Sequence, residues 1–488
     1  MNTVRPIKNR RIVQVSRSSE FNHLQEDFVK TYKCIRVIGL SLVFILIGPG
    51  ATLNARAAEP DDQTVQRIES EVAELRAAIE ELRAEGSTND RLDEIERRLG
   101  ILATELEDLK VGEEVITATV EEARPGLGPA ASKVYRKDQG ISIGGYGEAV
   151  VAAPSSTRDD GSPSGKDATF DMLRGVFYVG YKFDDRFLLN TEIEFEHAST
   201  SKSGSASVEF AYIDYLYRDA FNLRGGLVLL PMGWINELHE PTVYLGSLRP
   251  ESERRIIPST WREGGVGVFG DFGGFTYRTY VVDGLDASGF SASGLRGGRQ
   301  KGSKALLEDI SWTGRLDWVG TPGFQAGLSF YTGNSGQGLE TADGGSLDVP
   351  TTIFDAHAEW RWRGLKLRGL YTQANLDDVA ALNEALGYEG AASVGEKLVG
   401  GYLEAGYDFL GGRRGRSLTP YLRWERINTQ EQVPVGWQSN PANDQEVFTL
   451  GIAYQPIEQI IIKIDWADVD NAAGTGVNQV NAQLGYIF

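Results

Sequence analysis

From residue 140 to the end of the 488-residue chain, apolar and polar side chains alternate with a period of two, which is the spacing of the two faces of a β-strand. Residues 353–363 show the alternation most clearly: Phe354 and Trp360 share one face, while Asp355 and Glu359 share the other. A helix would mix these residues on every face. This feature therefore restricts the fold of the region to a sheet.

The alternation recurs in about sixteen segments between residues 140 and 488. Each segment presents one charged and one apolar face, and the chain has too little other apolar sequence to cover so many apolar faces. Lipid is therefore the better apolar environment, and a closed barrel is the only sheet that satisfies its backbone hydrogen bonds there. We predict an all-β transmembrane barrel of about sixteen antiparallel strands.

The connections between these segments alternate in length. Short turns such as 184–185 and 363–364 alternate with long polar loops such as 231–260 and 284–307. Bacterial outer-membrane barrels have short periplasmic turns and longer external loops. An even strand number would also place both ends of the barrel in the periplasm.

The chain ends on an aromatic residue within an amphipathic segment, Gln479 to Phe488. Val480, Leu484 and Tyr486 alternate there with polar or small residues. The segment resembles the C-terminal strand of outer-membrane barrels, which the assembly machinery reads. It indicates a location in the bacterial outer membrane.

Residues 1–57 have the three parts of a secretory signal peptide. A basic region precedes the apolar run from Val37 to Gly48, and Ala55-Arg56-Ala57 follows as an A-x-A cleavage site. The run is too short to span a bilayer comfortably, so a retained anchor is the less favoured alternative. The one cysteine, Cys34, lies in this leader, and the mature chain needs no disulfide in the oxidising periplasm.

Residues 58–111 carry the heptad pattern of a coiled coil, with α-helical periodicity. Apolar residues follow 3-4-3-4-3 spacings from Val65 to Leu82 and again from Leu92 to Leu109. Residues 86–90 interrupt the pattern. Either a continuous coil has a local irregularity there, which we favour, or the segment folds back as a helical hairpin. We predict a periplasmic coiled coil over 58–111, a linker over 112–139 and the barrel domain over 140–488.

The charge of the chain excludes one class of partner. The whole chain has a net charge of −19; cleavage after residue 57 would leave 40 basic and 65 acidic residues, a net charge of −25. So acidic a surface argues against binding to nucleic acid.

The long loop 231–260 follows the fifth predicted strand. The segment from Arg249 to Gly270 (RPESERRIIPSTWREGGVGVFG) resembles the segment after the third loop of outer-membrane porins of the phosphate-selective O/P-type group, and Gly144 to Glu148 resembles their first barrel strand. In sixteen-stranded porins, the third loop folds into the lumen and narrows the pore. The resemblance implies a trimer of separate pores, and porins of a related kind carry a periplasmic coiled coil ahead of the barrel.

The resemblance also implies that charged residues in and after this loop lie at the pore constriction. Opposed charges there would create a transverse field that sorts polar solutes. The alternative is that several of them form salt bridges that pin the loop to the wall. The candidates are Glu237, Arg249, Glu251, Glu253, Arg254, Arg255, Arg262 and Glu263.

A second set of charges lies opposite apolar residues in the strand pattern. A charge facing the lipid midplane costs about 2–4 kcal/mol, so these groups should face water in the lumen. They carry both signs, whereas a phosphate channel needs a mainly basic wall; the solute stays open among an anion such as a dicarboxylate, a sugar and an amino acid. The candidates are Glu192, Glu194, Glu196, Arg278, Arg315, His357, Glu359, Arg361, Lys366, Arg368 and Arg423.

No enzymatic constellation is visible in the sequence. Only His197, His239 and His357 remain after cleavage of the leader, and H-E-x-x-H, G-x-S-x-G and cysteine ligand sets are missing. We therefore expect no catalytic residues, no cofactor and no metal site.

We predict an outer-membrane porin that lets small hydrophilic solutes or ions diffuse passively through a water-filled, loop-constricted pore. The alternative is a structural tether, in which the coiled coil binds peptidoglycan and the barrel serves as an anchor. The expected partners are outer-membrane lipids, two further copies of the chain and the solute, with peptidoglycan added for the tether. An open constriction would favour transport, and a plugged lumen would favour tethering.

Overall fold

The structure is a computed structural model that describes residues 123–341, 343–411 and 415–488. The predicted signal peptide, the predicted coiled coil and residues 112–122 of the predicted linker lie outside the described residues. Within the described ranges, no helix is both long and apolar enough to cross a lipid bilayer.

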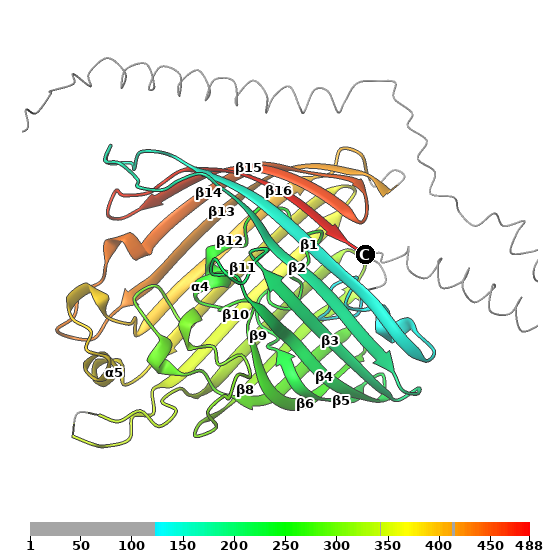
Figure 1. Cartoon of the computed structure of the whole chain (residues 1–488), viewed down its shortest axis with the longest axis horizontal. Helices are drawn as coiled ribbons and strands as arrows, with labels where there is room; N and C mark the ends of the chain where they lie inside the picture. Colours follow the sequence, from blue (N-terminus) through cyan, green and yellow to red (C-terminus); the bar gives the residue numbers. More distant parts are fainter. Residues whose placement is uncertain (1–122, 342, 412–414) are drawn as a thin grey trace, which may run out of the picture. The chain divides into compact units, whose positions relative to one another are not determined.

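Sixteen antiparallel strands form a closed barrel in which every strand pairs with its neighbours in the sequence and the last strand pairs with the first (Figure 1). The predicted sixteen-stranded barrel is confirmed. The strands are β1 (Gly140–Pro154), β2 (Thr169–Lys182), β3 (Phe187–Glu196), β4 (Ala206–Arg218), β5 (Phe221–Leu229), β6 (Arg262–Phe272), β7 (Phe275–Asp283), β8 (Ile310–Thr321), β9 (Phe324–Asn334), β10 (Pro350–Trp362), β11 (Leu365–Leu376), β12 (Lys397–Tyr407), β13 (Ser417–Gln432), β14 (Asp444–Ile457), β15 (Ile460–Asn471) and β16 (Gln479–Ile487).

The period-two pattern separates the two faces of the barrel wall. In β10, Asp355 and His357 point inward and are 1% and 4% exposed, whereas Phe354 and Trp360 point outward and are 38% and 44% exposed. The same division holds along the other strands, so the outer surface is mainly apolar and the charged side chains gather inside. A closed ladder leaves no unpaired strand edge.

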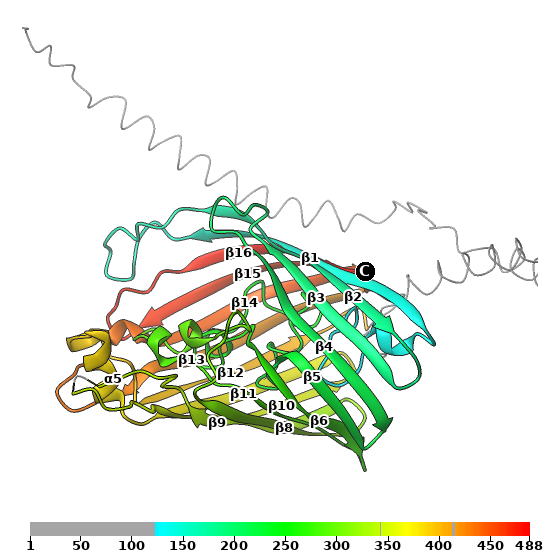
Figure 2. The ribbon, with the colours of Figure 1, turned by 60° about the horizontal axis from the view of Figure 1, so that its bottom comes forward.

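The barrel closes between β1 and β16, which lie side by side in Figure 2. Beyond the end of β16, the N–H of Gly145 donates to the carbonyl of Phe488 at 3.0 Å, and the N–H of Phe488 donates to the carbonyl of Gly145 at 2.9 Å. The Phe488 ring also meets the Phe177 ring edge-on at 6.1 Å. The terminal aromatic residue therefore extends the closing pair of strands.

Alternate connections are short. Two residues, Arg363 and Gly364, join β10 to β11 with φ angles of 48° and 88°. Both lie in the left-handed region that a tight hairpin turn with the right twist requires, and glycine adopts it without cost. The long connections all leave the opposite end of the barrel, as the alternating loop lengths predicted.

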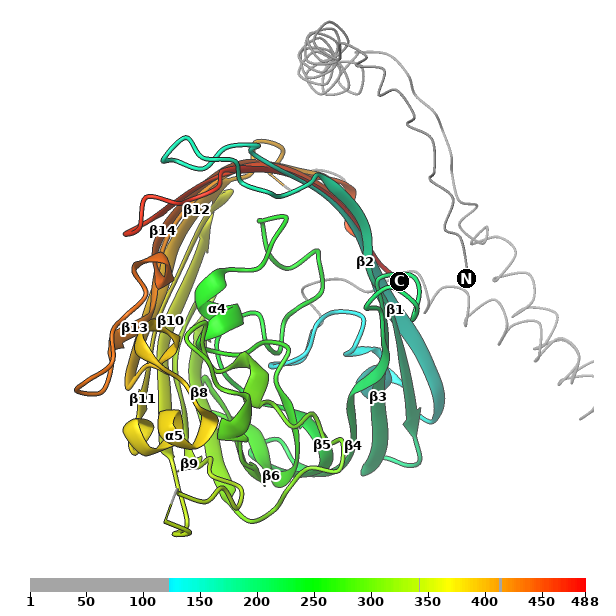
Figure 3. The ribbon, with the colours of Figure 1, turned by 60° about the vertical axis from the view of Figure 1, so that its left-hand side comes forward.

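Parts of the chain fill much of the barrel interior. Figure 3 shows α4 and the chain around it inside the ring of strands. Trp234, Trp261, Phe290 and Leu127 belong to one buried apolar cluster formed by these inner segments and the wall. The helices of the described region are η2 (Lys133–Arg136), α4 (Glu251–Arg255), η3 (Ala287–Gly289), η4 (Arg296–Gly298), α5 (Val379–Leu386), η5 (Gly390–Ala392) and η7 (Pro441–Asn443).

Barrel closure makes a first prediction at Gly145. A Cβ atom there would lie 2.2 Å from the carbonyl oxygen of Val176 and 2.6 Å from the Phe488 ring. We expect Gly145→Ala to lower the free energy of unfolding by about 1–3 kcal/mol, because the crowded atoms include backbone that cannot move away. Urea unfolding of the folded barrel, followed by tryptophan fluorescence, measures this change.

The matched control is Gly175→Ala on β2. A Cβ atom at Gly175 would meet nothing within 4 Å, so this variant should unfold at the wild-type urea concentration. Equal midpoints for the two variants would contradict the proposed crowding at the β1–β16 seam.

Candidate functional site in the barrel lumen

The connection between β5 and β6, residues 230–261, forms an inner loop that crosses the barrel interior (Figure 3). Asn236 holds its two ends together: the side-chain amide donates to the carbonyls of Leu230 at 2.7 Å and Trp261 at 2.9 Å. The Asn236 side-chain oxygen accepts the N–H of Trp261 in return. The loop thus leaves and rejoins the wall at one place, while its middle reaches across the lumen.

The first part of the inner loop contacts β10 and β11. The N–H of Gly233 donates to Asp355 at 3.0 Å, and the indole N–H of Trp234 donates to the carbonyl of Gly369 at 3.3 Å. The Trp234 ring meets the His357 ring edge-on at 4.9 Å. These contacts fix the loop to one side of the wall.

The middle of the inner loop contacts β1 and β15. The Tyr244 hydroxyl donates to Glu148 at 3.0 Å, and the N–H of Ser247 donates to Asp465 at 2.7 Å. Lys463 donates to the carbonyl of Gly246 at 3.0 Å and lies 3.7 Å from the centre of the Tyr244 ring. Since β1 and β15 lie far around the barrel from β10 and β11, the loop bridges the lumen.

Glu253 on α4 is the central acceptor of the inner loop. One carboxylate oxygen accepts the N–H groups of Trp234 at 2.7 Å and Ile235 at 2.6 Å, and the other accepts the Tyr402 hydroxyl at 2.7 Å. Burial raises the pKa of Glu253. This predicted constriction residue therefore ties α4, the start of the loop and β12 together.

The other charges of α4 meet solvent. The Arg254 side chain is half exposed and pairs with Glu251 at 2.6 Å. Arg255 is partly exposed and donates to the carbonyl of Ser293 at 2.9 Å. Arg249, just before the helix, has intermediate exposure, and one of its guanidinium nitrogens is buried. Arg254, Arg255 and Glu251 are thus the predicted constriction residues that keep access to water.

Glu237 of the inner loop joins a buried ion network on the wall. It accepts two hydrogen bonds from Arg278, at 2.8 and 2.9 Å, and lies 3.8 Å from Arg315. Asp317 accepts from both arginines, at 3.1 and 2.7 Å, and faces His357 at 2.7 Å. Every charge in the network has an opposite neighbour, as a buried charge requires.

Arg262 and Glu263, at the start of β6, are also buried in pairs. Arg262 donates to Glu209 at 2.9 Å. Glu263 accepts the Gln300 N–H at 3.0 Å and the Lys301 N–H at 2.9 Å, and so holds the next long connection against β6. Several of the predicted constriction charges therefore form the pinning contacts that the sequence left as the alternative.

The predicted wall charges near β10 and β11 form a second ion network. Glu359 accepts from Arg361 and Arg368 at 2.6 Å each and lies 3.9 Å from Lys366. Arg361 is half exposed, while the other three side chains are largely shielded. Among the remaining wall candidates, Glu196 accepts from Ser205 at 2.9 Å and Arg423 lies 3.8 Å from Glu404.

Glu192 and Glu194 of β3 point inward and are buried. Arg174 lies between Glu148 at 2.9 Å and Glu194 at 3.5 Å. Glu192 faces His239 of the inner loop at 3.1 Å. Burial lowers the pKa of His239, but the carboxylates beside it raise that pKa by more, to about 9.

Residues 123–139, the described part of the predicted linker, lie inside the barrel. Glu240 accepts the N–H groups of Ala130 at 3.1 Å and Ala131 at 3.2 Å, and burial raises the pKa of Glu240 to about 7. The Tyr135 hydroxyl donates to Asp214 on β4 at 2.6 Å. This segment therefore contacts both the inner loop and the wall before β1 begins.

Arg296 and Arg299, in the connection between β7 and β8, are absent from the sequence-based candidates. Burial and neighbouring arginines, among them Arg254, lower the pKa of Arg296 to about 9; burial and Arg262 lower the pKa of Arg299 to about 10. The pKa shifts of both arginines come first from burial and second from neighbouring positive charges. The signal was the basic, glycine-rich run 294–304 in an otherwise acidic chain.

Comparison with known proteins identifies a relative with a similar sequence. No protein-family model matches the sequence. An uncharacterized protein of Aquifex aeolicus (strain VF5) is 34% identical over 369 residues, which are 73% of this chain and 82% of the relative.

Solved structures with a similar fold are distant in sequence. They include Salmonella typhi OmpF in complex with daunomycin (12% identity, 72% of this chain and 98% of that chain, TM-score 0.49). The outer membrane channel DcaP of Acinetobacter baumannii has 12% identity over 71% of this chain and 97% of that chain, with a TM-score of 0.46. The in-vitro folded trimer form of OmpT, an outer membrane protein of Vibrio cholerae, has 10% identity over 72% of this chain and 100% of that chain, with a TM-score of 0.45.

The role of Glu253 as an anchor makes a second prediction. We expect Glu253→Ala to lower the free energy of unfolding by about 3 kcal/mol or more, because three buried donors lose a charged acceptor. Tyr402→Phe removes one of these donors together with its hydrogen bond and should cost about 1.5–3 kcal/mol. Urea unfolding of the purified protein measures both.

Glu251→Ala is the matched control, two residues away on the same helix. Its ion pair with Arg254 is partly exposed, and such pairs contribute about 0–1 kcal/mol. A Glu253→Ala variant no less stable than Glu251→Ala would disprove the anchoring role.

Proposed function

The chain belongs to the same family as the uncharacterized Aquifex aeolicus protein, and we propose that it is an outer-membrane porin that admits small hydrophilic solutes by passive diffusion. The observation that carries the proposal is the division of the closed wall: apolar side chains face outward, and ion networks face inward. Only a bilayer makes this division favourable on so many strands at once. The protein supplies no chemistry in this role; its wall and inner loop select the solute.

The exposed guanidinium groups of α4 support a preference for anionic solutes. Arg254 is half exposed on the inner loop, and its charge is close enough to Arg296 to lower the pKa of that arginine. Cations held together in this way attract an anion, which relieves their mutual repulsion. The buried pairs of Glu237, Glu253, Arg262 and Glu263 would set the width of the passage by holding the loop in place.

The remaining parts of the chain fit an exported trimeric protein. We assign residues 1–57 to a signal peptide, 58–111 to a periplasmic coiled coil, 112–139 to a linker and 140–488 to the outer-membrane barrel. The coiled coil would hold three barrels together beneath the membrane. The resemblance to porins of the O/P-type group supports a trimer but not a preference for phosphate.

A structural tether is the second candidate function. The amount of protein inside the barrel favours it, since the inner loop and residues 123–139 both occupy the interior. In this role the coiled coil would bind peptidoglycan, and the barrel would carry little current.

Electrical recording separates the two functions and makes a third prediction. The full-length protein in a planar bilayer should conduct ions, and its reversal potential under a salt gradient should indicate a preference for anions. Arg254→Ala combined with Arg255→Ala should move the reversal potential toward zero or toward the cation side, because the exposed positive charges are lost.

Arg426→Ala is the control for the double variant. Arg426 is an exposed arginine that pairs with Asp444 at 3.2 Å and has the outward phase of β13. Its removal should leave the reversal potential unchanged. A folded protein that carries no current would overturn the porin proposal in favour of the tether, and an unshifted double variant would remove these arginines from the selectivity site.

Deletion of residues 58–111 tests the assembly role of the coiled coil and is a fourth prediction. If the coil joins three barrels, the shortened protein should run as a monomer in size-exclusion chromatography with light scattering, while still conducting. Intact trimers in the shortened protein would assign the coil a role other than assembly. Loss of binding to purified peptidoglycan sacculi would then support the tether.

A further inference from the structure

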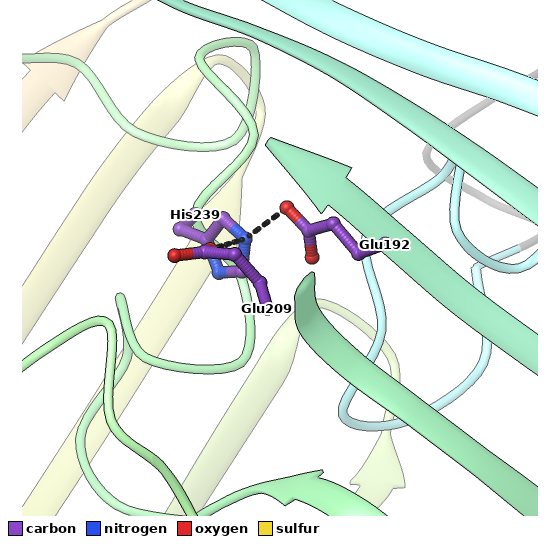
Figure 4. Close-up of side chains that lie close together, drawn as sticks. All are labelled: Glu192, Glu209 and His239. Atoms are coloured by element: carbon purple, nitrogen blue, oxygen red, sulfur yellow. Dashed lines mark hydrogen bonds and ion pairs between the residues drawn. The ribbon is translucent and has the colours of Figure 1, made fainter. Parts of the chain in front are cut away.

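Three side chains from three parts of the chain converge inside the barrel: Glu192 on β3, Glu209 on β4 and His239 on the inner loop (Figure 4). One ligating atom from each lies within 4.8 Å of the other two. All three side chains are almost completely buried, at 0%, 1% and 2% exposure. The group is neither catalytic nor part of the exposed lumen surface described above.

The histidine ring is oriented by a backbone carbonyl. Nδ1 of His239 lies 2.9 Å from the carbonyl oxygen of Asn236, and because a carbonyl only accepts, Nδ1 carries a hydrogen and donates it. Nε2 therefore faces the two carboxylates, Glu192 at 3.1 Å and Glu209 at 3.6 Å. Metal-binding histidines are typically held in this way, with the second ring nitrogen bonded to a carbonyl or carboxylate.

If Nε2 carries a proton, its one N–H group cannot form hydrogen bonds with both carboxylates. A single N–H points at one acceptor, and at these distances that acceptor is Glu192. The second oxygens of Glu192 and Glu209 are buried and have no hydrogen-bond partner among the described residues. Unpaired buried carboxylate oxygens are costly, whereas a cation between the three groups would be shared by all of them.

The surrounding charges leave a negative excess. Ion pairs connect Arg174 with Glu148 and Glu194, and Arg262 with Glu209, while the ion pair of Glu192 among the described residues is with the histidine. Four carboxylates thus share two guanidinium groups in a buried region. With His239 neutral, as a metal ligand must be, two further positive charges would balance these groups, and one divalent cation supplies both.

A second buried histidine shows what an ordinary ion-pair arrangement looks like in this barrel. His357 bonds Asp355 through Nδ1 at 2.6 Å and Asp317 through Nε2 at 2.7 Å. Each carboxylate faces its own ring nitrogen, and the two lie on opposite sides of the ring. At His239, by contrast, both carboxylates meet the same nitrogen.

We propose that Glu192, Glu209 and His239 bind a divalent transition-metal ion, with Zn²⁺ as the best match, which fastens the inner loop to β3 and β4. Ligand atoms bound at about 2.0–2.2 Å to a tetrahedral ion lie roughly 3.3–3.6 Å apart. The two distances from Nε2 to the carboxylates, 3.1 and 3.6 Å, bracket this spacing. A water molecule would complete a four-coordinate site of one nitrogen and two carboxylate ligands.

The test, our fifth prediction, uses untagged full-length protein purified in detergent, stripped with EDTA and dialysed against Zn²⁺. Elemental analysis should find about one zinc ion per chain in the wild type, as one three-ligand site requires. Glu192→Gln and His239→Gln should lower the zinc content to the background level. Both variants are preferred to a substitution of Glu209, because they leave the pair of Arg262 with Glu209 intact.

His357→Gln is the matched control and should bind zinc as the wild type does. Gel mobility before and after boiling shows whether each variant has a folded barrel, so a folding failure is recognised separately. Zn²⁺ should also raise the unfolding temperature of the wild type and of His357→Gln but not that of the two ligand variants.

Two outcomes would overturn the proposal. One is a folded wild type that retains no Zn²⁺ above background, which would mean that Nε2 carries a proton. The other is equal zinc loss in His357→Gln and His239→Gln. Conductance of the stripped wild type, recorded on the same preparation, shows whether the pore functions independently of the metal.

Discussion

The structure depends on a continuous ring of backbone hydrogen bonds. Sixteen strands pair in sequence, and the pair of β1 with β16, extended by Gly145 and Phe488, leaves no edge unpaired. Such closure lets an extended backbone exist in lipid, where water cannot satisfy a free N–H or C=O group. Because the outer face must then be apolar, almost all charge on the strands is directed inward. The electrostatics of the lumen follow from this requirement.

Within the lumen, the buried charged side chains need opposite charges or hydrogen-bond partners. The inner loop carries Glu237, Glu253 and His239 into the barrel, and each meets donors or ions on the wall. These contacts reach β7, β12 and β3, and the contacts of Tyr244 and Ser247 reach β1 and β15, so the loop spans the opening. The charges left exposed, above all Arg254 and Arg255, are the ones available to a solute. In the proposed porin, pore width and solute preference would thus come from different residues of one loop.

The barrel could be predicted because its evidence is local. Period-two alternation and turn residues each involve only a few neighbouring residues. Together with the alternating loop lengths, they yield the right strand number. The candidate lumen residues were also found by strand phase, since Glu192, Arg278 and Glu359 do point inward. Their roles were not predictable in the same way. Glu251 and Glu253 are two residues apart on α4, yet one is partly exposed and the other is fully buried by Tyr402 and Trp234.

The sequence by itself determined that the chain forms a closed wall with apolar side chains outside and charges inside, because side-chain period and hydrophobicity are properties of each short segment. Only the tertiary structure decided which charges meet. Glu192, Glu209 and His239 lie on two strands and a loop, and Arg296 belongs to a different connection from Arg254, whose charge acts on it. Strand register and the path of the inner loop set these distances. Both are fixed by the packing of the whole barrel, which no single segment encodes.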